Sequence, residues 1–220
     1  MLTKKRFLLY FNDFRGYLKN QYLNNFHYNN KKNHRKKMLH LASNSKSRAL
    51  LLKKFNIPFK QQAPHYDEEQ IETKNAKDFA YIASKGKLES AIKEFGLAIP
   101  LLTADSVILS AEGELLRKPK NVDDAKRILE LQSGSSMAII SAMHYKTKNF
   151  YLSDVSATYY NFSKFDLDDL EEYLQSNLWD GKAGGCMVEG FCKKYIKSVQ
   201  GNESTAMGLN VERLLGWISL

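Results

Sequence analysis

Residues 39–52 read LHLASNSKSRALLL: a short apolar strand runs into a serine-rich turn and then into a helix. Ser45 is a suitable N-cap for this helix, because its hydroxyl can accept a hydrogen bond from a first-turn N–H group. The expected apolar stripe of the helix consists of Leu50, Leu51, Leu52 and Phe55. A buried strand that leads directly into a helix is typical of α/β proteins, so the segment predicts such a unit at the start of the folded part.

The rest of the chain alternates irregularly between strand and helix patterns, without an internal repeat. Helices are expected over 75–95, from the N-cap Asn121 to Gly134, after the N-cap Asp166, and from Val211 to Ile218. Strands are expected over 99–104 (ending at Asp105), 107–109, 136–145 and 150–162, with a strand pair over about 186–199. The pattern predicts an α/β fold with a mixed sheet.

The formal net charge of +9 comes from the first 37 residues. These residues contain ten of the 33 basic side chains and one of the 24 acidic ones, so residues 38–220 carry 23 of each sign. A protein that binds DNA through phosphate contacts needs a basic surplus on its folded surface. The charge distribution therefore argues against nucleic acid as the main partner.

Residues 1–37 form an extension rich in Asn, Lys and aromatic residues, which precedes a folded domain expected over 38–220. The apolar run 7–11 is too short for a signal peptide, and no stretch of the chain is long enough to cross a bilayer. Three interpretations of the extension stay open. It is a disordered or locally helical tail, an upstream addition with Met38 as the functional start, or a basic arm that binds RNA or anionic lipid.

Several polar clusters lie at the ends of expected elements, where α/β proteins build their sites. In the first, three hydroxyls with Lys46 and Arg48 surround the N-terminus of the helix that Ser45 begins. Helix N–H groups and basic side chains together can cradle a phosphate group. The same serines could equally serve as helix caps, with solvated basic side chains beside them.

Asp105 and Lys118 are the next candidates. A carboxylate directly after an apolar strand could bind a divalent metal or take a proton from water, or it could accept backbone N–H bonds in a turn. Lys118 precedes Pro119, and the restricted X-Pro segment would hold the ammonium group at a fixed height, suited to a phosphate. A solvated loop lysine is the alternative.

The glycine-rich stretch 181–190 would let the backbone approach a ligand closely. Within it, Glu189 needs a partner if it is buried, or else it lies exposed on a hairpin. Cys186 and Cys192 are too far apart for a CxxC pair, and we expect them to be core or rim thiols and not nucleophiles.

The sequence contains no GxxxxGK[ST], GxSxG, GxGxxG or HExxH motif, and its five histidines are scattered. The commonest nucleotide-binding, serine hydrolase and zinc-site classes are therefore excluded.

Taken in order, the clusters resemble the motifs of the Maf family, the septum-formation-associated nucleoside triphosphate pyrophosphatases. The matching motifs are Leu41-Ala42-Ser43-Asn44-Ser45 with Arg48, Asp67-Glu68, Lys85, Ala104-Asp105-Ser106, Lys118-Pro119, Ser133-Gly134, Lys182-Ala183-Gly184, Glu189-Gly190, Gly201-Asn202 and Met207-Gly208-Leu209. The resemblance covers about 38–215 and rests on the order and spacing of the motifs, since none of them is specific alone.

The resemblance implies a cytoplasmic enzyme that hydrolyses a nucleoside triphosphate to a monophosphate and pyrophosphate with Mg²⁺ or Mn²⁺, clearing non-standard or surplus nucleotides. It also implies a homodimer and an elongated two-lobed mixed sheet with flanking helices, similar to inosine triphosphate pyrophosphatases. Asp105 would be the proton acceptor and, with Glu68, a metal ligand. The residues implied to hold the triphosphate are Ser43, Ser45, Arg48, Lys85, Lys118 and Lys182, and those implied in base choice are Ser47, Ser106 and Glu189.

Some positions depart from the family pattern. Ser47 lies where members often carry the arginine or tryptophan of Ser-Pro-Arg-Arg or Ser-Pro-Trp-Arg, and Ser106 lies where Thr or Gln is common. Arg117 replaces the usual glycine before Lys-Pro, and Asn210 replaces a common proline. These departures leave the preferred base open.

Two alternatives to the enzyme follow from the same residues. The first is a non-catalytic nucleotide-binding regulator of septum formation, which the substitutions at Ser47 and Arg117 favour. The second is nucleic-acid binding through residues 1–37.

Overall fold

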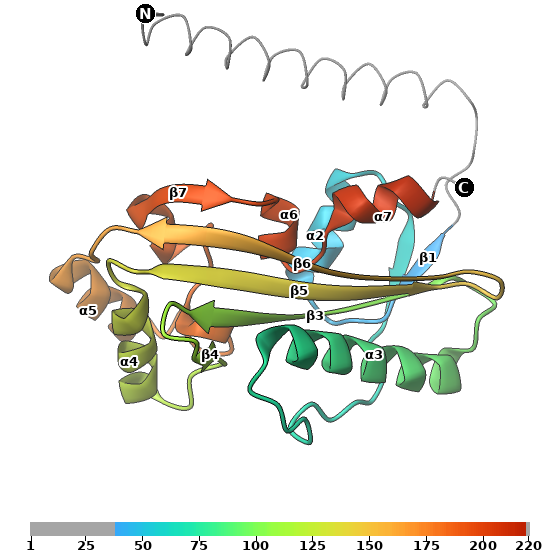
Figure 1. The fold of residues 1–220 in the computed structure, drawn as a ribbon, viewed down its shortest axis with the longest axis horizontal. Helices are drawn as coiled ribbons and strands as arrows, with labels where there is room; N and C mark the ends of the chain where they lie inside the picture. The colour runs from blue at the N-terminus through green and yellow to red at the C-terminus, as the bar shows by residue number, and fades with distance from the viewer. Residues whose placement is uncertain (1–37, 219–220) are drawn as a thin grey trace, which may run out of the picture. The chain divides into compact units, whose positions relative to one another are not determined.

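A mixed sheet of seven strands forms the centre of the computed structural model, which describes residues 38–218 (Figure 1). The strands are β1 (Leu39–Leu41), β2 (Phe59–Gln61), β3 (Leu101–Ser110), β4 (Leu115–Leu116), β5 (Ser136–Lys146), β6 (Tyr151–Phe162) and β7 (Ile196–Gln200). They lie in the order β2-β1-β3-β5-β6-β7, with β4 paired to β3 beside this path. β1 is parallel to β2 and β3, and the other pairs are antiparallel. The predicted mixed α/β sheet is confirmed, and the expectations for residues 1–37 fall outside the described residues.

The helices begin at polar residues, as the sequence predicts. The α-helices are α2 (Lys46–Lys54), α3 (Ala76–Phe95), α4 (Val122–Gln132), α5 (Leu167–Gln175), α6 (Glu203–Ala206) and α7 (Val211–Ile218), and the 3₁₀-helices are η1 (Ala183–Gly185) and η2 (Phe191–Tyr195). Side chains of Ser45, Asn121 and Asp166 accept first-turn N–H groups of α2, α4 and α5, which confirms these three predicted caps. Among the described helices, none has the length and apolar character that crossing a membrane requires.

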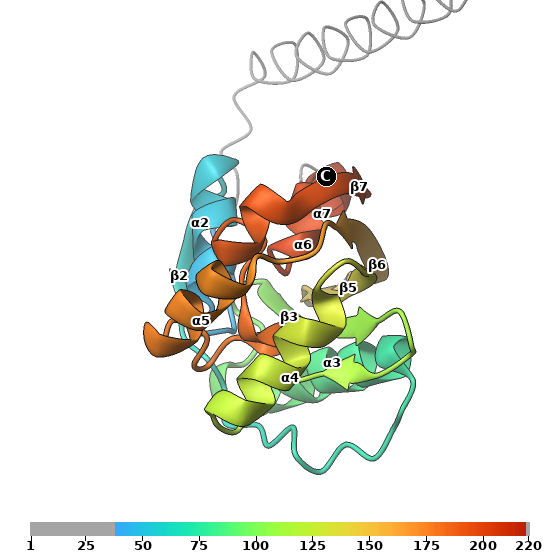
Figure 2. The same ribbon diagram turned by 90° about the vertical axis from the view of Figure 1, so that its left-hand side faces the viewer.

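The helices cover both faces of the sheet: α3 lies on one face, and α2, α6 and α7 lie on the other (Figures 1 and 2). Val107 of β3 packs in a buried cluster with α3, whereas Leu102 and Ala104 pack in a cluster with α2 and α7. Successive strand residues point to opposite faces. The side chain of Asp105 is therefore directed to the α3 face and that of Ser106 to the α2 face.

β3 is one strand of ten residues, where the sequence predicted two strands separated at Asp105. Its register with β5 runs without interruption from Leu101–Lys146 to Ser110–Met137. A carboxylate in the middle of a strand is tolerated here because it has charged partners on its own face, which are described below. The prediction that Asp105 ends a strand is wrong.

The apolar stripe predicted for α2 is partly wrong. Leu50 is 58% exposed, while Ala49, Leu51 and Leu52 are buried. Arg48 is also buried, although it is charged. A buried guanidinium needs hydrogen-bond acceptors around it, so its burial is the first structural indication of a site beside α2.

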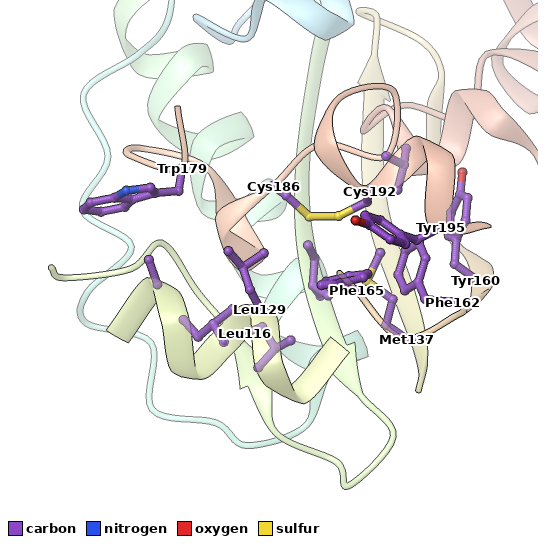
Figure 3. Packing of buried hydrophobic residues seen from close by; sticks show 14 of the residues in the cluster. Leu116, Leu129, Met137, Tyr160, Phe162, Phe165, Trp179, Cys186, Cys192 and Tyr195 are labelled. Carbon is purple, nitrogen blue, oxygen red and sulfur yellow. A yellow bond between two sulfur atoms is a disulfide. The ribbon is translucent and has the colours of Figure 1, made fainter. Parts of the chain in front are cut away.

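A third buried cluster fills the end of the sheet near α4, α5 and η2 (Figure 3). Aromatic rings dominate it: Phe165 lies 4.8 Å from Tyr195, and Tyr173 is stacked on Phe191 at 4.4 Å between ring centroids. This packing fixes the chain that follows α5 and so positions η1, which borders the site.

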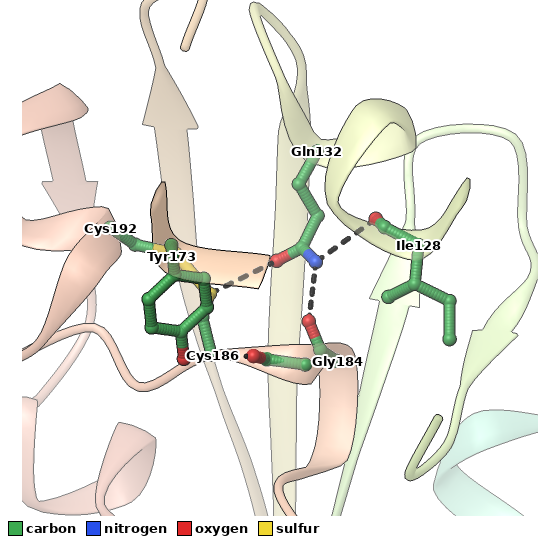
Figure 4. Close-up of a disulfide and its surroundings, with 7 residues drawn as sticks. Ile128, Gln132, Tyr173, Gly184, Cys186 and Cys192 are labelled. Carbon is green, nitrogen blue, oxygen red and sulfur yellow. Dashed lines mark hydrogen bonds between the residues drawn. A yellow bond between two sulfur atoms is a disulfide. The ribbon is translucent and has the colours of Figure 1, made fainter. Parts of the chain in front are cut away.

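A disulfide joins Cys186 and Cys192 in this cluster, so the prediction of separate thiols is wrong (Figure 4). The predicted strand pair over 186–199 is wrong as well, because irregular chain and η2 replace its first strand and only β7 forms at its end. The Cα atoms of the two cysteines lie 6.6 Å apart. Cys186 Sγ lies 3.9 Å from Gln132 Oε1, and the amide of Gln132 donates to Gly184 O at 2.7 Å. The Gln132 amide thus anchors η1 to α4, and the disulfide joins the end of η1 to η2.

Candidate active site

The candidate site lies at a gap in the strand pairing of β3. β1 pairs with β3 no further than Leu102, whose carbonyl accepts a bond from Ala42 N at 2.8 Å. β4 pairs with β3 only from Ile108 onward. Asp105 lies in the stretch between, and Ser43 follows the end of β1. Ligands in open α/β sheets bind beyond the carboxyl ends of strands, and the end of β1 meets the middle of β3 here.

Lys87 of α3 joins two carboxylates on one face of this gap. Its Nζ lies 2.6 Å from Asp105 Oδ1 and 3.2 Å from Glu68 Oε2. Asp105 is only 6% exposed, so its charge requires a partner, which the ammonium group supplies. Asp105 and Glu68 therefore both lie within hydrogen-bonding reach of a single nitrogen atom.

Gly86 allows the segment that carries Glu68 to approach α3. A Cβ atom at this position would overlap the ring of Tyr66, which lies against the helix backbone. Tyr66 precedes Glu68 by two residues, and Gly86 directly precedes Lys87. The contact between the ring and the glycine thus sets the acid beside the lysine.

The surroundings shift the pKa values of the two carboxylates in opposite directions. Burial raises the pKa of Asp105 above its ordinary value, although the charges of Lys87 and Arg48 oppose this. Burial alone would also raise the pKa of Glu68, but the charge and hydrogen bond of Lys87, with a further contribution from Lys118, lower it below the ordinary value. Asp105 is therefore a stronger base than an ordinary aspartate, and Glu68 a weaker base than an ordinary glutamate. Perturbed pKa values in neighbouring acids are typical of sites that transfer protons.

Arg48 of α2 holds the other side of the gap together. It donates from Nε to Gly208 O at 2.8 Å, from Nη1 to Ser43 Oγ at 3.0 Å and from Nη2 to Ser106 Oγ at 3.2 Å. Gly208 has a φ of 100°, which side chains rarely adopt, and it brings its carbonyl close to the guanidinium. Because Ser106 directly follows Asp105, the Arg48 cluster fixes the backbone next to the carboxylate.

The turn between β1 and α2 is ordered by its own hydroxyls. Ser45 Oγ accepts Arg48 N at 3.3 Å, and Ser43 Oγ accepts Ser45 N at 3.2 Å. Gln61 of β2, which the sequence analysis missed, donates from Nε2 to Ser43 O at 2.7 Å and to Ser45 O at 3.2 Å. The helix cap is confirmed, and the phosphate cradle at the same turn stays a prediction.

Two further lysines lie on neighbouring segments. The amide of Gly184 in η1 donates to Arg117 O at 3.0 Å, and Gly185 lies against the ring of Pro119. Lys118 is exposed and Lys182 is half-buried, so both keep their ammonium groups accessible. Gly184 has a φ of 68°, which is the reason that a glycine stands at this turn.

The structure brings Lys87, and not the expected Lys85, to Asp105, and which of the two lysines holds substrate stays a prediction. Lys85 is exposed, as is Glu189 in the segment between η1 and η2. Ser47 is half-buried in the first turn of α2.

Helix periodicity would have identified Lys87. Ala80, Ala83, Lys87 and Ala91 are spaced three or four residues apart, and the three alanines are buried. Lys87 is thus the charged residue on the buried stripe of α3. Lys85 lies two residues before it and so falls on a different side of the helix.

The carboxylates of Asp105 and Glu68 fit a divalent cation that is held in part by the phosphates of a bound substrate. Among residues 38–218, no group of three or more His, Cys, Asp and Glu side chains is arranged to hold a metal ion. Mg²⁺ is commonly bound by one or two carboxylates together with substrate phosphates and waters. Asp105 and Glu68 supply these two carboxylates, which leaves the other coordination positions to phosphates and waters.

The arrangement combines a buried base with groups that suit a polyanion. Asp105 can accept a proton, while Arg48, Lys87 and Lys118 supply positive charge and Ser43 a hydroxyl. Oxyanions of transferring phosphoryl groups are stabilised by such preorganised cations and donors. The geometry therefore suits the hydrolysis of a phosphate ester or anhydride.

Comparison with known proteins agrees with this chemistry. A family model described as "Maf-like protein" matches residues 38–219. A protein of a Nitratiruptor species named nucleoside triphosphate pyrophosphatase is 50% identical over 179 residues, which cover 80% of this chain and 96% of that protein. Proteins of the same name from Helicobacter pylori and Campylobacter jejuni subsp. doylei are each 38% identical, and the matches cover 82% of this chain and 94% and 100% of those proteins.

Proposed function

The chain belongs to the Maf family, and from this premise we propose that it is a nucleoside triphosphate pyrophosphatase, as its curated relatives are named. The reaction splits the anhydride between the α- and β-phosphates and yields a nucleoside monophosphate and pyrophosphate. The observation that carries the proposal is the position of Asp105: it bonds to Lys87 and directly precedes Ser106 of the Arg48 cluster, in the part of β3 that neither β1 nor β4 covers.

In the proposed mechanism Asp105 accepts a proton from a water molecule whose oxygen attacks the α-phosphorus. The bond from this phosphorus to the bridging oxygen breaks, and pyrophosphate leaves with that oxygen. The raised pKa of Asp105 makes it a better acceptor than an ordinary aspartate. Lys87 fixes the orientation of the carboxylate through its 2.6 Å bond.

The triphosphate is proposed to bind along the cationic side of the site. It carries about four negative charges, so positive groups and helix N–H groups must gather around it. Support comes from Arg48 and Ser43 next to the N-terminus of α2, and from Lys118 and Lys182 on adjoining segments. Mg²⁺ or Mn²⁺ held by Asp105, Glu68 and the phosphates would supply charge neutralisation and polarise the phosphoryl oxygens.

The residues proposed for base choice differ in their freedom to act. The Ser106 hydroxyl is already engaged, with Arg48 on one side and Ser141 Oγ at 2.7 Å on the other. Glu189 is exposed, and Ser47 lies in the first turn of α2. Of these three side chains, we therefore propose Glu189 as the one that contacts the nucleobase.

The proposal is tested by incubating the full chain with Mg²⁺ or Mn²⁺ and a panel of standard and modified nucleoside triphosphates. We expect equimolar monophosphate and pyrophosphate, resolved by anion-exchange chromatography, and loss of both products on addition of EDTA. Diphosphate and orthophosphate as products would contradict the proposed bond cleavage. Tight nucleotide binding without any turnover would select the alternative, a non-catalytic regulator of septum formation.

Lys87 and Lys85 offer a second test within one helix. We expect Lys87→Ala to lower kcat/KM by about 10²-fold, because Asp105 loses its ion pair and its orientation. Lys85→Ala should stay within about threefold of the unsubstituted chain if Lys87 is the residue that acts, since the range corresponds to less than 1 kcal/mol. The opposite order of the two effects, measured by initial rates, would reinstate the assignment made from the sequence.

We also propose that the enzyme works in the cytoplasm, where nucleoside triphosphates are made and used, and that two copies associate. Support for association comes from exposed apolar side chains on the α3 face of β6. These are Tyr151, Val155 and Tyr159, which are 42%, 40% and 50% exposed.

A further inference from the structure

Arg117 departs from the family pattern, in which a glycine precedes Lys-Pro, and its contacts assign it a role. The residue directly follows β4 and directly precedes Lys118. Its side chain is 46% exposed, yet it contacts two other segments that carry residues of the proposed active site. We call residues 66–71, which contain Glu68, the Glu68 loop.

The first contact is a paired salt bridge to the Glu68 loop. Arg117 Nη2 lies 3.0 Å from Glu69 Oε1, and Nη1 lies 3.3 Å from Glu69 Oε2. Two parallel N–H···O bonds between a guanidinium and a carboxylate fix orientation as well as distance. Glu69 directly follows Glu68, so the pair acts on the backbone next to the carboxylate that bonds to Lys87.

The loop has its own internal order, which transmits this restraint. Glu69 N donates to Asp67 Oδ1 at 3.0 Å, and Ile71 N donates to Glu68 O at 3.3 Å. Asp67 and Ile71 therefore close a turn around Glu68. A restraint on Glu69 limits the movement of the whole turn.

The second contact is to α3, the helix that carries Lys87. The guanidinium carbon of Arg117 lies 5.2 Å from the centre of the Phe79 ring, within the range of cation–π attraction. In addition, Arg117 O accepts the bond from Gly184 N, which ties η1 to the same residue. The side-chain and backbone contacts together join the Glu68 loop, α3, η1 and the Lys118 segment.

We propose that Arg117 is a positioning residue of the pyrophosphatase: through Glu69 it holds the Glu68 loop against α3, so that Glu68 meets Lys87 and Asp105 before substrate arrives. The inference rests on the proposed function. It also gives a physical role to a substitution that the sequence pattern alone marks as a departure from the family.

The position of the contacts predicts which kinetic constant responds. Glu68 and Lys87 surround the base, whereas Ser43 and Arg48 are held by bonds that do not involve the Glu68 loop. Loss of the Arg117 side chain leaves Arg117 O in place, so the contact with η1 remains. We therefore expect kcat to fall and KM to stay nearly constant.

The test compares five variants of the full chain: two single substitutions, their combination, Arg117→Glu alone, and the exchange of the two charges. Arg117→Met and Glu69→Ala should each lower kcat about three- to fivefold, the range expected for an exposed ion pair, and change KM less than twofold. The double variant should be no slower than either single one, because both remove the same interaction. Exchange of the two charges, Arg117→Glu with Glu69→Arg, should recover most of the rate that Arg117→Glu alone loses.

The matched control is Arg127→Met. Arg127 has a similar exposure, 50%, and also pairs with acidic side chains: its Nη1 contacts both carboxylate oxygens of Glu114, at 2.8 and 3.1 Å, and its Nη2 contacts Asp124 at 3.0 Å, but it lies on α4. We expect its kcat to match that of the unsubstituted chain. Equal loss in Arg127→Met, an additive double variant, or a charge exchange without recovery would each overturn the inference.

A second measurement separates this inference from the proposed function. Without substrate, amide hydrogen exchange of residues 66–75 should be at least threefold faster in Arg117→Met and unchanged in Arg127→Met. Faster exchange in a chain that hydrolyses no nucleotide would contradict the proposed function and still support the restraint. Unchanged exchange together with an unchanged kcat, in a chain that does hydrolyse nucleotides, would refute the restraint alone.

Discussion

Asp105→Asn is expected to lower kcat/KM for nucleoside triphosphate hydrolysis by roughly 10³-fold, within the range that general-base groups contribute. The amide cannot accept the proton of the attacking water, although its shape is nearly the same. The fold should survive the change, because Lys87 keeps Glu68 as a partner at 3.2 Å. Removal of a buried charge should leave the melting temperature equal or slightly higher, since burial of the carboxylate is unfavourable.

The control for this variant is Asp123→Asn, an exposed aspartate in the first turn of α4. Its rate should match that of the unsubstituted chain. The measurement is product formation under single-turnover conditions, which separates the chemical step from product release. A rate for Asp105→Asn within tenfold of the unsubstituted chain would assign the proton transfer to another group.

Arg48→Ala is expected to damage both stability and substrate binding. It leaves Gly208 O without its donor, reduces the hydroxyls of Ser43 and Ser106 to their bonds with Ser45 N and Ser141 Oγ, and opens space in the core. Unpaired buried polar groups cost about 1–3 kcal/mol each, and the net loss should be roughly 3–4 kcal/mol after partial relaxation. For a chain of this length, that corresponds to a fall of about 10 °C in the melting temperature.

The matched control for Arg48 is Arg213→Ala. Arg213 also pairs with an acid, Asp154 at 3.3 Å, but its side chain is 64% exposed. Exposed pairs contribute little, so its melting temperature should fall by less than about 3 °C. The melting temperatures of both variants are measured by differential scanning calorimetry. Equal falls would show that the buried network around Arg48 contributes no more to stability than a surface ion pair.

Most elements of the fold follow from the sequence because their signals are local. The two long strands and the helix caps at Ser45, Asn121 and Asp166 appear where hydrophobic alternation and capping residues predict them. The three-residue strand β2 does not, since its residues are largely exposed and only its pairing with β1 defines it. The disulfide depends on two irregular turns whose geometry no periodicity encodes.

The candidate site was predictable in its residue types and less so in its geometry. The resemblance gave Asp105, Glu68 and Arg48, which the structure places around the gap in β3. Reading Asp105 as the end of a strand failed because the unbroken register with β5, a long-range property, extends the strand past a charged residue. Lys85 was expected at the site from the resemblance, whereas Lys87 is the lysine that meets Asp105. The buried stripe of α3 on which Lys87 lies is made largely of alanines, whose hydrophobic signal in the sequence is weak.

The shortness of β1 has a consequence for how this architecture can vary. β1 has three residues beside the ten of β3. A first strand of ordinary length would continue to pair with β3 and would occupy the free edge of its backbone. The carboxylate of Asp105 would then be closed off from a reactant. Sheet continuity and catalytic access thus compete for the same stretch of main chain. Insertions that lengthen β1 should extend the strand pairing and lower the turnover rate. We expect added residues to be tolerated instead at the hairpin between β5 and β6, at the end of these strands.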